Sequence, residues 1–569
     1  MAGALFALVL YLPSLGFPFV FDDHALIDAG GNPIALGGTL AYRPVRYASY
    51  RIDAALGGSP LVYHAHSVLL FALLTALVAR LARRLGAGAA GALAGALLVA
   101  AHPLAVEAVA YVAGRRDLLS AVLGLGAILA WIDARRALAI ALLLLGAGAK
   151  ESALLIAPVM MLASLGGVAT RRSGDRRLLL LGGAASVALV LAYGAIGPWA
   201  PAPEWAGLAL PGRVLAHYAD HLLRPLLLAG AGLSTEYPDL VSFVERVRGG
   251  DLAGAAPAWM SVTLMIAVAL IATTVLAQRG GGRIALVRGR SLPSNGPGGN
   301  AGDDASAAIA AWRFIAAWAS LGAAALAIWG GLHEPGVDRH ALVVLPVAGV
   351  AAALALTRLP GNARVAAFAL SGAALLALVP ATREQMQFWR SERALWTHTV
   401  AEQPSAARAR VNLAGVLAAE GRYGEAARHL GLVLDGQPHF VAAYVGRAVV
   451  RCAQGRPVAA RRDLTRALSL GAEFASIEGV GRDCPLPEFA AAAPKVGVLP
   501  AAAARLPVAA QAPAASSAAP AATAPPAATA APAATAAPAA TAAPAAASSP
   551  AAAASAPVRT ARDARGTRT

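Results

Sequence analysis

Charged residues are scarce in this sequence, and their scarcity excludes an ordinary soluble fold. Only 14% of the 569 residues are Asp, Glu, Lys or Arg, whereas 58% are hydrophobic. Soluble globular proteins carry about 25% charged residues, and an apolar run of about 20 residues is long enough to cross a bilayer. The composition therefore predicts an integral membrane protein that crosses the bilayer many times.

Lysine and cysteine are nearly absent. Lys150 and Lys495 are the two lysines, so arginine supplies nearly all of the basic residues behind the net charge of +16. These arginines flank apolar segments, which is the pattern that orients a membrane protein and not the pattern of a nucleic-acid-binding face. The two cysteines, Cys452 and Cys484, form neither a disulfide framework nor the spacing of a metal site. We therefore expect no nucleic-acid partner.

The apolar segments predict about eleven membrane-spanning helices. They lie near residues 1–19, 62–82, 88–106, 117–133, 137–149, 152–169, 177–196, 260–277, 312–331, 341–357 and 364–382. With the N-terminus in the cytoplasm, the arginine-rich turns fall on the cytoplasmic side, as the positive-inside rule requires. An odd number of spans then places everything after residue 383 outside the cytoplasm. The Arg, Ala and Gly bias suggests a bacterial genome, hence an inner-membrane protein with a periplasmic C-terminal part.

The segment 137–169 allows two interpretations. As one span it would reverse the topology and expose the following arginine-rich turn on the wrong side. As a hairpin, its first arm is about 13 residues, or about 20 Å, so that Lys150 and Glu151 lie below the outer surface of the bilayer. A charge at that depth costs about 2.5–3.5 kcal/mol. Either the two residues pair with each other in a tight turn, or they face a water-filled cavity near a reaction centre.

Acidic and basic residues gather in the outer turns. Besides Lys150 and Glu151, the candidates are Asp22, Asp23, Arg43, His102, Glu107, Arg115, Asp338 and Arg339. The alternative is that these are scattered charges at helix ends, and that the two adjacent aspartates cap a helical turn. No two histidines in these turns are four residues apart, and the five-residue spacing of His102 and Glu107 points to different helix faces, so we expect no metal site.

Two further regions follow the last span. Pro404 and Pro438 are 34 residues apart, which is the period of tetratricopeptide repeats. The second repeat has Arg447 and Arg451 at usually apolar positions and is predicted to be degraded, while 386–403 acts as a capping half-repeat. Two repeats rarely fold on their own, and we therefore expect them to pack on the membrane domain. Such repeats generally hold an extended peptide or a partner in a groove.

The C-terminal region differs in composition from both. Beyond residue 486 the chain is rich in Ala, Pro and Thr, which cannot build a core. The sequence thus predicts an all-α protein with a membrane helical bundle (1–385), a short repeat solenoid (386–480) and a disordered tail (486–569).

In combination, these motifs resemble those of one enzyme family. The segments "FVFDDHALI", "AHPLAVEAVAYVAGRRDLLS", "KESALL" and "VDRHALVVLP", followed by the repeats, are similar in order and spacing to the transmembrane and tetratricopeptide-repeat O-mannosyltransferases and their bacterial relatives. The resemblance implies a glycosyltransferase of the GT-C class with its active site on the outer face. It also implies a sugar donor carried on a polyprenyl phosphate, and inversion at the anomeric carbon.

The resemblance also implies roles for the candidate residues. Asp22 would be the general base that takes the proton of the acceptor hydroxyl, with Asp23 as its alternative or orienting partner and Glu107 as the second acidic residue. Arg339 would hold the lipid phosphate, with Lys150 as a second candidate, because a phosphate leaving group needs positive charge nearby. Supporting roles would fall to Arg43, His102, Arg115, Glu151 and Asp338. Asp53, in the first outer loop but outside the motif, is expected to tolerate substitution.

Three functions therefore compete at this point. The first is transfer of a sugar, mannose being the family's best-known cargo, to a hydroxyl on a protein or glycan that the repeats hold, with no cofactor. The second is a non-catalytic membrane-anchored repeat scaffold, and the third is a transporter of a polar lipid. Charges in the membrane favour the enzyme, because a scaffold has no need of them. A transporter would show inverted repeats with interrupted helices, and the sequence has no such symmetry.

Overall fold

The computed structural model describes residues 1–34, 43–169, 174–196, 222, 225, 307–316, 318–319, 321–322 and 338–472. This part of the chain is helical apart from its loops and an isolated bridge between Ile27 and Pro33. The prediction of an all-α fold is confirmed. The predicted span 260–277, much of 312–331 and the tail 486–569 lie outside the described residues.

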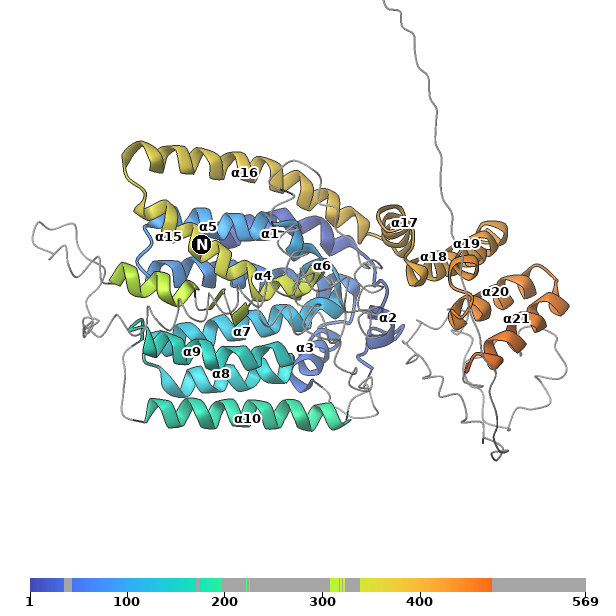
Figure 1. The fold of residues 1–569 in the computed structure, drawn as a ribbon, viewed down its shortest axis with the longest axis horizontal. Helices are drawn as coiled ribbons and strands as arrows, with labels where there is room; N and C mark the ends of the chain where they lie inside the picture. The colour runs from blue at the N-terminus through green and yellow to red at the C-terminus, as the bar shows by residue number, and fades with distance from the viewer. Residues whose placement is uncertain are drawn as a thin grey trace, which may run out of the picture. The chain divides into compact units, whose positions relative to one another are not determined.

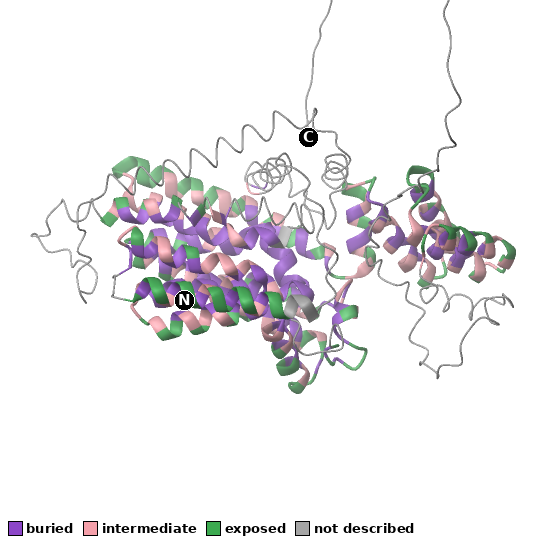
Figure 2. Cartoon of the chain, turned by 60° about the horizontal axis from the view of Figure 1, so that its bottom comes forward, coloured by how far each residue is buried: buried purple, intermediate pink, exposed green. Residues whose placement is uncertain are grey.

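The N-terminal region is a bundle of apolar helices. Its first elements are α1 (Ala2–Tyr11), η1 (Leu12–Gly16), α2 (Asp23–Leu26), α3 (Pro44–Ala55), α4 (Pro60–Arg84), α5 (Ala89–Ala101), η3 (Pro103–Ala105), α6 (Val106–Ala110) and η4 (Val112–Gly114). These are followed by α7 (Arg115–Ile132), α8 (Arg136–Ala149), η5 (Glu151–Leu155), α9 (Ile156–Leu165), α10 (Asp175–Ile196), η7 (Asp338–Val343), α15 (Leu345–Arg358) and α16 (Gly361–Phe388). Helices α7, α8, α9 and α10 lie side by side (Figure 1). Figure 2 shows that buried residues fill the interior of this bundle, whereas much of α16 is exposed.

The described residues contain fewer full-length spans than predicted for them. Among the described residues, α4 with 25 residues and α16 with 28 are long and apolar enough to cross a membrane. Ala89–Ala101 and Pro103–Ala110 form a third candidate, bent by 59°. Helices such as α8 and α15, at 14 residues each, reach only about 21 Å, against a hydrocarbon core of about 30 Å. The prediction of about eleven spans is therefore corrected to two continuous candidates and one bent candidate in this part of the chain.

The segment 137–169 is a hairpin. Helix α8 ends at Ala149, and Lys150 is extended, with φ −158° and ψ 145°. The chain then reverses its direction. The reversal brings Ala153 close to Gly146: a Cβ atom added at Gly146 would lie 3.2 Å from the Cβ of Ala153. Lys150 and Glu151 therefore stand at the tip of a hairpin, as the second interpretation of this segment requires.

Glycine allows two helices of the bundle to pack very closely. A Cβ at Gly95 of α5 would lie 2.2 Å from the carbonyl oxygen of Gly349 in α15. No side chain fits between the backbones at this point, so the contact depends on the missing Cβ atoms. Small residues at helix contacts are typical of membrane proteins, in which close backbone packing replaces part of the hydrophobic effect.

The C-terminal helices form hairpins with the predicted period. They are α17 (Glu392–Glu402), α18 (Ala407–Ala419), α19 (Tyr423–Gly436), α20 (Val441–Ala453) and α21 (Pro457–Ser469). Helices α20 and α21 each begin 34 residues after α18 and α19 respectively. Turns at Gly421 and Gly455, with φ of +75° and +70°, separate the paired helices. The assignment of these hairpins to the tetratricopeptide family stays a prediction.

The second hairpin keeps its two arginines by pairing them. Asp463 of α21 is only 3% exposed, and its carboxylate lies 2.8 Å from Arg447 and 2.6 Å from Arg451 of α20. The arginines thus replace an apolar contact with a charged one, which explains how this hairpin packs despite them. Cys452 of α20 is disulfide-bonded, so the prediction that cysteine forms no disulfide is wrong for this residue. Cys484, the other cysteine, lies outside the described residues.

Candidate functional site

The two adjacent aspartates stand on a strained turn. Phe21, directly before them, has a φ of +52°, in the left-handed region that bulky residues rarely adopt. Asp22 is half-buried and occupies the N-cap position of α2, but its side chain forms no capping hydrogen bond. The structure therefore gives no support to the alternative in which Asp22 caps the next helical turn.

Asp23 differs sharply from Asp22. It is completely buried. Its Oδ1 atom accepts a hydrogen bond from the backbone N–H of Ala113 at 2.7 Å, and Oδ2 accepts one from Val20 at 3.2 Å. Burial raises the pKa of Asp23 from its usual 3.8 to about 7. Asp23 therefore ties the acidic turn to the backbone before α7, and of the two carboxylates Asp22 is the more exposed.

One group of charges, the Arg115 cluster, is centred on an ion pair that is enclosed by protein, with the partly exposed His66 at its edge. It comprises Arg115, Asp53, His66, Tyr63 and Ser67. The Arg115 guanidinium forms an ion pair with Asp53, donates to the carbonyl oxygen of Tyr63 at 2.5 Å and donates to Ser67 at 3.2 Å. His66 lies 2.7 Å from the other Asp53 oxygen. These contacts hold Arg115 and Asp53 together inside the bundle and argue against the expectation that Asp53 tolerates substitution.

A second group, the Lys150 cluster, surrounds the tip of the hairpin. It comprises Lys150, Asp117, Glu151 and Arg43. The Lys150 amine forms an ion pair with Asp117 of α7, and Glu151 lies 2.8 Å from Arg43. Each of the two residues therefore forms an ion pair with another segment, so Lys150 and Glu151 are not a pair that is satisfied only within the tight turn.

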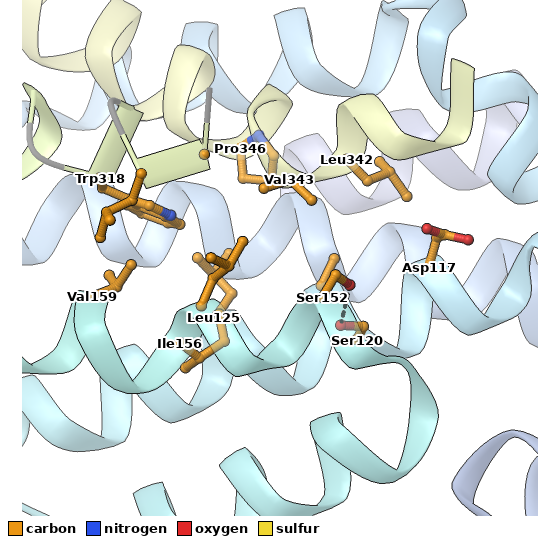
Figure 3. A pocket seen from close by; sticks show the side chains of 14 residues that line it. Asp117, Ser120, Leu125, Ser152, Ile156, Val159, Trp318, Leu342, Val343 and Pro346 are labelled. Carbon is orange, nitrogen blue, oxygen red and sulfur yellow. Dashed lines mark hydrogen bonds between the residues drawn. The ribbon is translucent and has the colours of Figure 1, made fainter. Parts of the chain in front are cut away.

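One member of the Lys150 cluster, Asp117, lines the end of an apolar pocket. Counting the open space at its mouth, the pocket has a volume of about 560 Å³. Its lining comprises Asp117, Ser120, Ala121, Leu125, Ser152, Leu155, Ile156, Val159, Trp318, Leu321, Gly322, Leu342, Val343 and Pro346. Figure 3 shows Asp117 at one end, beside Ser120 and Ser152, which are hydrogen-bonded at 3.1 Å, and Trp318 at the other. Such a lining suits an apolar ligand with one polar or charged end.

The remaining candidates fall into different positions. Glu107 is buried in the short helix α6. His102 caps a turn: its Nδ1 accepts from the N–H of Leu104 at 3.3 Å, and its Nε2 lies 3.0 Å from the carbonyl oxygen of Leu222, so its expected supporting role is structural. Asp338 and Arg339 belong to η7, but their side chains lie outside the described residues. Among the residues that the structure describes, no group of three His, Cys, Asp or Glu is placed to hold a metal ion.

Sequence reasoning missed the importance of Asp53 and Asp117. Asp53 pairs with a residue 62 positions away and Asp117 with one 33 positions away, so no local pattern reveals either contact. Asp117 does fall in the first turn of α7. A carboxylate at that position is equally well explained by the helix dipole, and this signal alone does not predict the pair.

Comparison with known proteins gives a partial resemblance. No family model matches the chain, and no solved structure matches it. A stretch of 150 residues is 32% identical to protein O-mannosyl-transferase Tmtc1 of Drosophila melanogaster and covers 23% of this chain and 17% of that protein. A stretch of 152 residues is 31% identical to human protein O-mannosyl-transferase TMTC2 and covers 23% of this chain and 18% of that protein. The matched part is less than a fifth of the length of these relatives, and it supports the predicted family resemblance.

Proposed function

We propose that this chain is a membrane glycosyltransferase that transfers a sugar, mannose as the names of its relatives suggest, to a hydroxyl acceptor. The observation that carries the proposal is the half-buried Asp22 carboxylate on a turn fixed by the completely buried Asp23. A general base must be accessible to the acceptor yet held in one position. Asp22 meets the first requirement, and the hydrogen bonds of Asp23 to Val20 and Ala113 meet the second.

The reaction we assign to this turn is a single displacement. Asp22 accepts the proton of the acceptor hydroxyl while the hydroxyl oxygen attacks C1 of the sugar. The bond between C1 and the phosphate oxygen breaks at the same time, so the configuration at C1 inverts and the phosphate leaves with its lipid. General base catalysis contributes about 10²–10⁴-fold in rate. Glu107, buried in α6, is the second acidic candidate, for orienting the acceptor.

The donor we propose is a sugar on a polyprenyl phosphate. The apolar pocket offers a wall for a prenyl chain, and at its end the Asp117 carboxylate is ion-paired with Lys150. A donor phosphate that displaced Asp117 would meet the Lys150 ammonium group. Leu342 and Val343 of η7 line this pocket, and Arg339 precedes them in the same 3₁₀ helix. Arg339 and Lys150 therefore remain the candidates for binding the donor phosphate.

We place the reaction on the extracytoplasmic face, with the helical hairpins after α17 on the same side. The disulfide bond of Cys452 supports this orientation, because disulfides form and persist in oxidising compartments such as the periplasm. A bacterial inner membrane is the location that best fits both this orientation and the composition. The hairpins would then hold an acceptor protein or glycan close to the acidic turn.

The test is transfer of mannose from polyprenyl-phosphate-mannose to peptide and glycan acceptors by the purified full chain in detergent. We expect Asp22→Asn to lower turnover by about 10²-fold or more without changing the thermal midpoint. The matched control is Asp28→Asn in the same loop, because the exposed Asp28 accepts hydrogen bonds from the backbone of Gly30 and Asn32, which an amide oxygen can replace. Turnover of Asp22→Asn within a few-fold of wild type would reject Asp22 as the base. A wild-type chain with no transfer from any polyprenyl-phosphate sugar would favour the scaffold.

A further inference from the structure

The acidic turn is held by aromatic rings from three other segments. Phe21 stacks on Tyr111 with ring centroids 6.0 Å apart, and it packs edge-to-face with Trp396 with centroids 4.8 Å apart. Tyr111 in turn stacks on Trp389 at 5.0 Å. These four residues, which we call the aromatic clamp, join the turn before Asp22 to the segment before α7 and to the end of α16 and helix α17. The clamp therefore links the turn to the C-terminal part of the chain.

Charged groups reinforce the same contact. Nε2 of His24 lies 3.0 Å from the carboxylate of Glu392, one helical turn before Trp396 on α17, so that both residues share one helix face. The guanidinium of Arg408, in the first turn of α18, lies 5.7 Å from the centre of the Phe21 ring. Helices α17 and α18 thus both contact residues 21–24, although the helices and the turn are far apart in the sequence.

We propose that Trp396 is a positioning residue that holds Phe21 in its strained conformation and thereby fixes the direction of Asp22. A bulky residue keeps a left-handed backbone only where its surroundings enforce it. Trp396 of α17 and Arg408 of α18 contact the Phe21 ring and hold it in this conformation. An acceptor held by the repeats is consequently kept in a constant relation to Asp22, because α17 and α18 support both. The catalytic consequence rests on the proposed function, whereas the positioning of the turn does not.

Hydrogen exchange of residues 20–27 tests the positioning separately from catalysis. In Trp396→Leu the edge contact to Phe21 is lost, and we expect exchange of these amides to quicken by about tenfold, because local opening becomes easier. Trp396→Phe restores an aromatic edge and should recover most of the protection. The matched control is Phe440→Leu, an aromatic residue before α20 in the second hairpin, which should leave exchange of residues 20–27 unchanged. Unchanged exchange of these residues in a folded Trp396→Leu protein would overturn the proposal.

Kinetics of the same variants give the catalytic consequence. We expect Trp396→Leu to lower kcat by about tenfold or more, as small displacements of catalytic groups do, and to leave the KM for the donor unchanged. If exchange quickens but the wild-type chain transfers no sugar, the clamp stands and the proposed function fails. If Trp396→Leu does not fold, Trp396→Met replaces it: a long apolar side chain fills more of the space of the indole but has no ring, and the residue 20–27 amides must then exchange faster. Wild-type exchange in Trp396→Met would likewise overturn the proposal.

Discussion

The Arg115 cluster and the Lys150 cluster are both buried groups of charge, yet their surroundings differ. The side chains of Arg115 and Asp53 are at most 1% exposed, and protein atoms meet all three nitrogens of the guanidinium. Lys150 is 2% exposed, but its partner Asp117 lines an apolar pocket. Burial alone therefore does not distinguish the two clusters. The useful distinction is whether one partner of the pair borders open space.

The largest expected effect is on folding, at the enclosed cluster. Arg115→Met leaves the Asp53 carboxylate buried without its guanidinium, and removing one partner of a buried pair costs about 3–5 kcal/mol. We expect a large fall in the thermal midpoint in detergent and little monodisperse protein.

The double variant Arg115→Met with Asp53→Leu is the control for this prediction. It removes both charges, so it should recover part of the lost stability. A single Arg115→Met variant with the wild-type midpoint would show that the cluster is not structural.

The sequence predicts much of the helical framework, but it does not predict how the Arg115 cluster differs from the Lys150 cluster. Apolar runs and the 34-residue period depend on local pattern, and they give α4, the hairpin at Lys150 and the helix starts of the repeats within a few residues. The break at His102 divides the predicted helix 88–106, and an apolar run does not reveal such an interruption.

Ion pairing is a property of the tertiary fold. Arg115 and Lys150 look alike in the sequence, since each is a basic residue in an outer turn. Which carboxylate each one meets depends on how α3, α4, α7 and α8 pack, and no spacing encodes that. The catalytic candidates Asp22 and Asp23 came from family resemblance, and their different burial came only from the fold.

The next effect in size is on catalysis, at the cluster beside the pocket. Lys150→Met should lower kcat/KM for the lipid donor by about 100-fold, the loss typical when one charge-stabilising donor is removed from a reaction site. Its thermal midpoint should fall less than that of Arg115→Met, because water in the pocket can solvate Asp117. Lys150→Arg keeps the charge and should be the milder change.

The matched control is Arg136→Met, which breaks a partly buried pair with Asp175 at 2.8 Å, at the opposite end of α8 from Lys150. This change should lower stability while leaving the donor KM unchanged. Wild-type values of kcat and donor KM in a folded Lys150→Met protein would remove Lys150 from the donor site.

The smallest expected effect concerns Asp23, a buried carboxylate held by backbone N–H groups and not by a basic side chain as in the two clusters. Folding raises its pKa from 3.8 to about 7, so the folded protein binds this proton more tightly than the unfolded chain does. The stabilisation is complete below pH 4 and is lost as the pH rises through 7. Between pH 6 and 8 the free energy of unfolding should therefore fall by about 1 kcal/mol.

The variant Asp23→Asn tests this prediction, because its side chain cannot titrate and the protein should lack this decline in stability. The measurement is the difference in the free energy of unfolding between wild type and variant, from denaturant titrations at each pH. Parallel stability curves would show that Asp23 keeps the same charge in both states, and that its backbone hydrogen bonds outweigh the desolvation of the carboxylate.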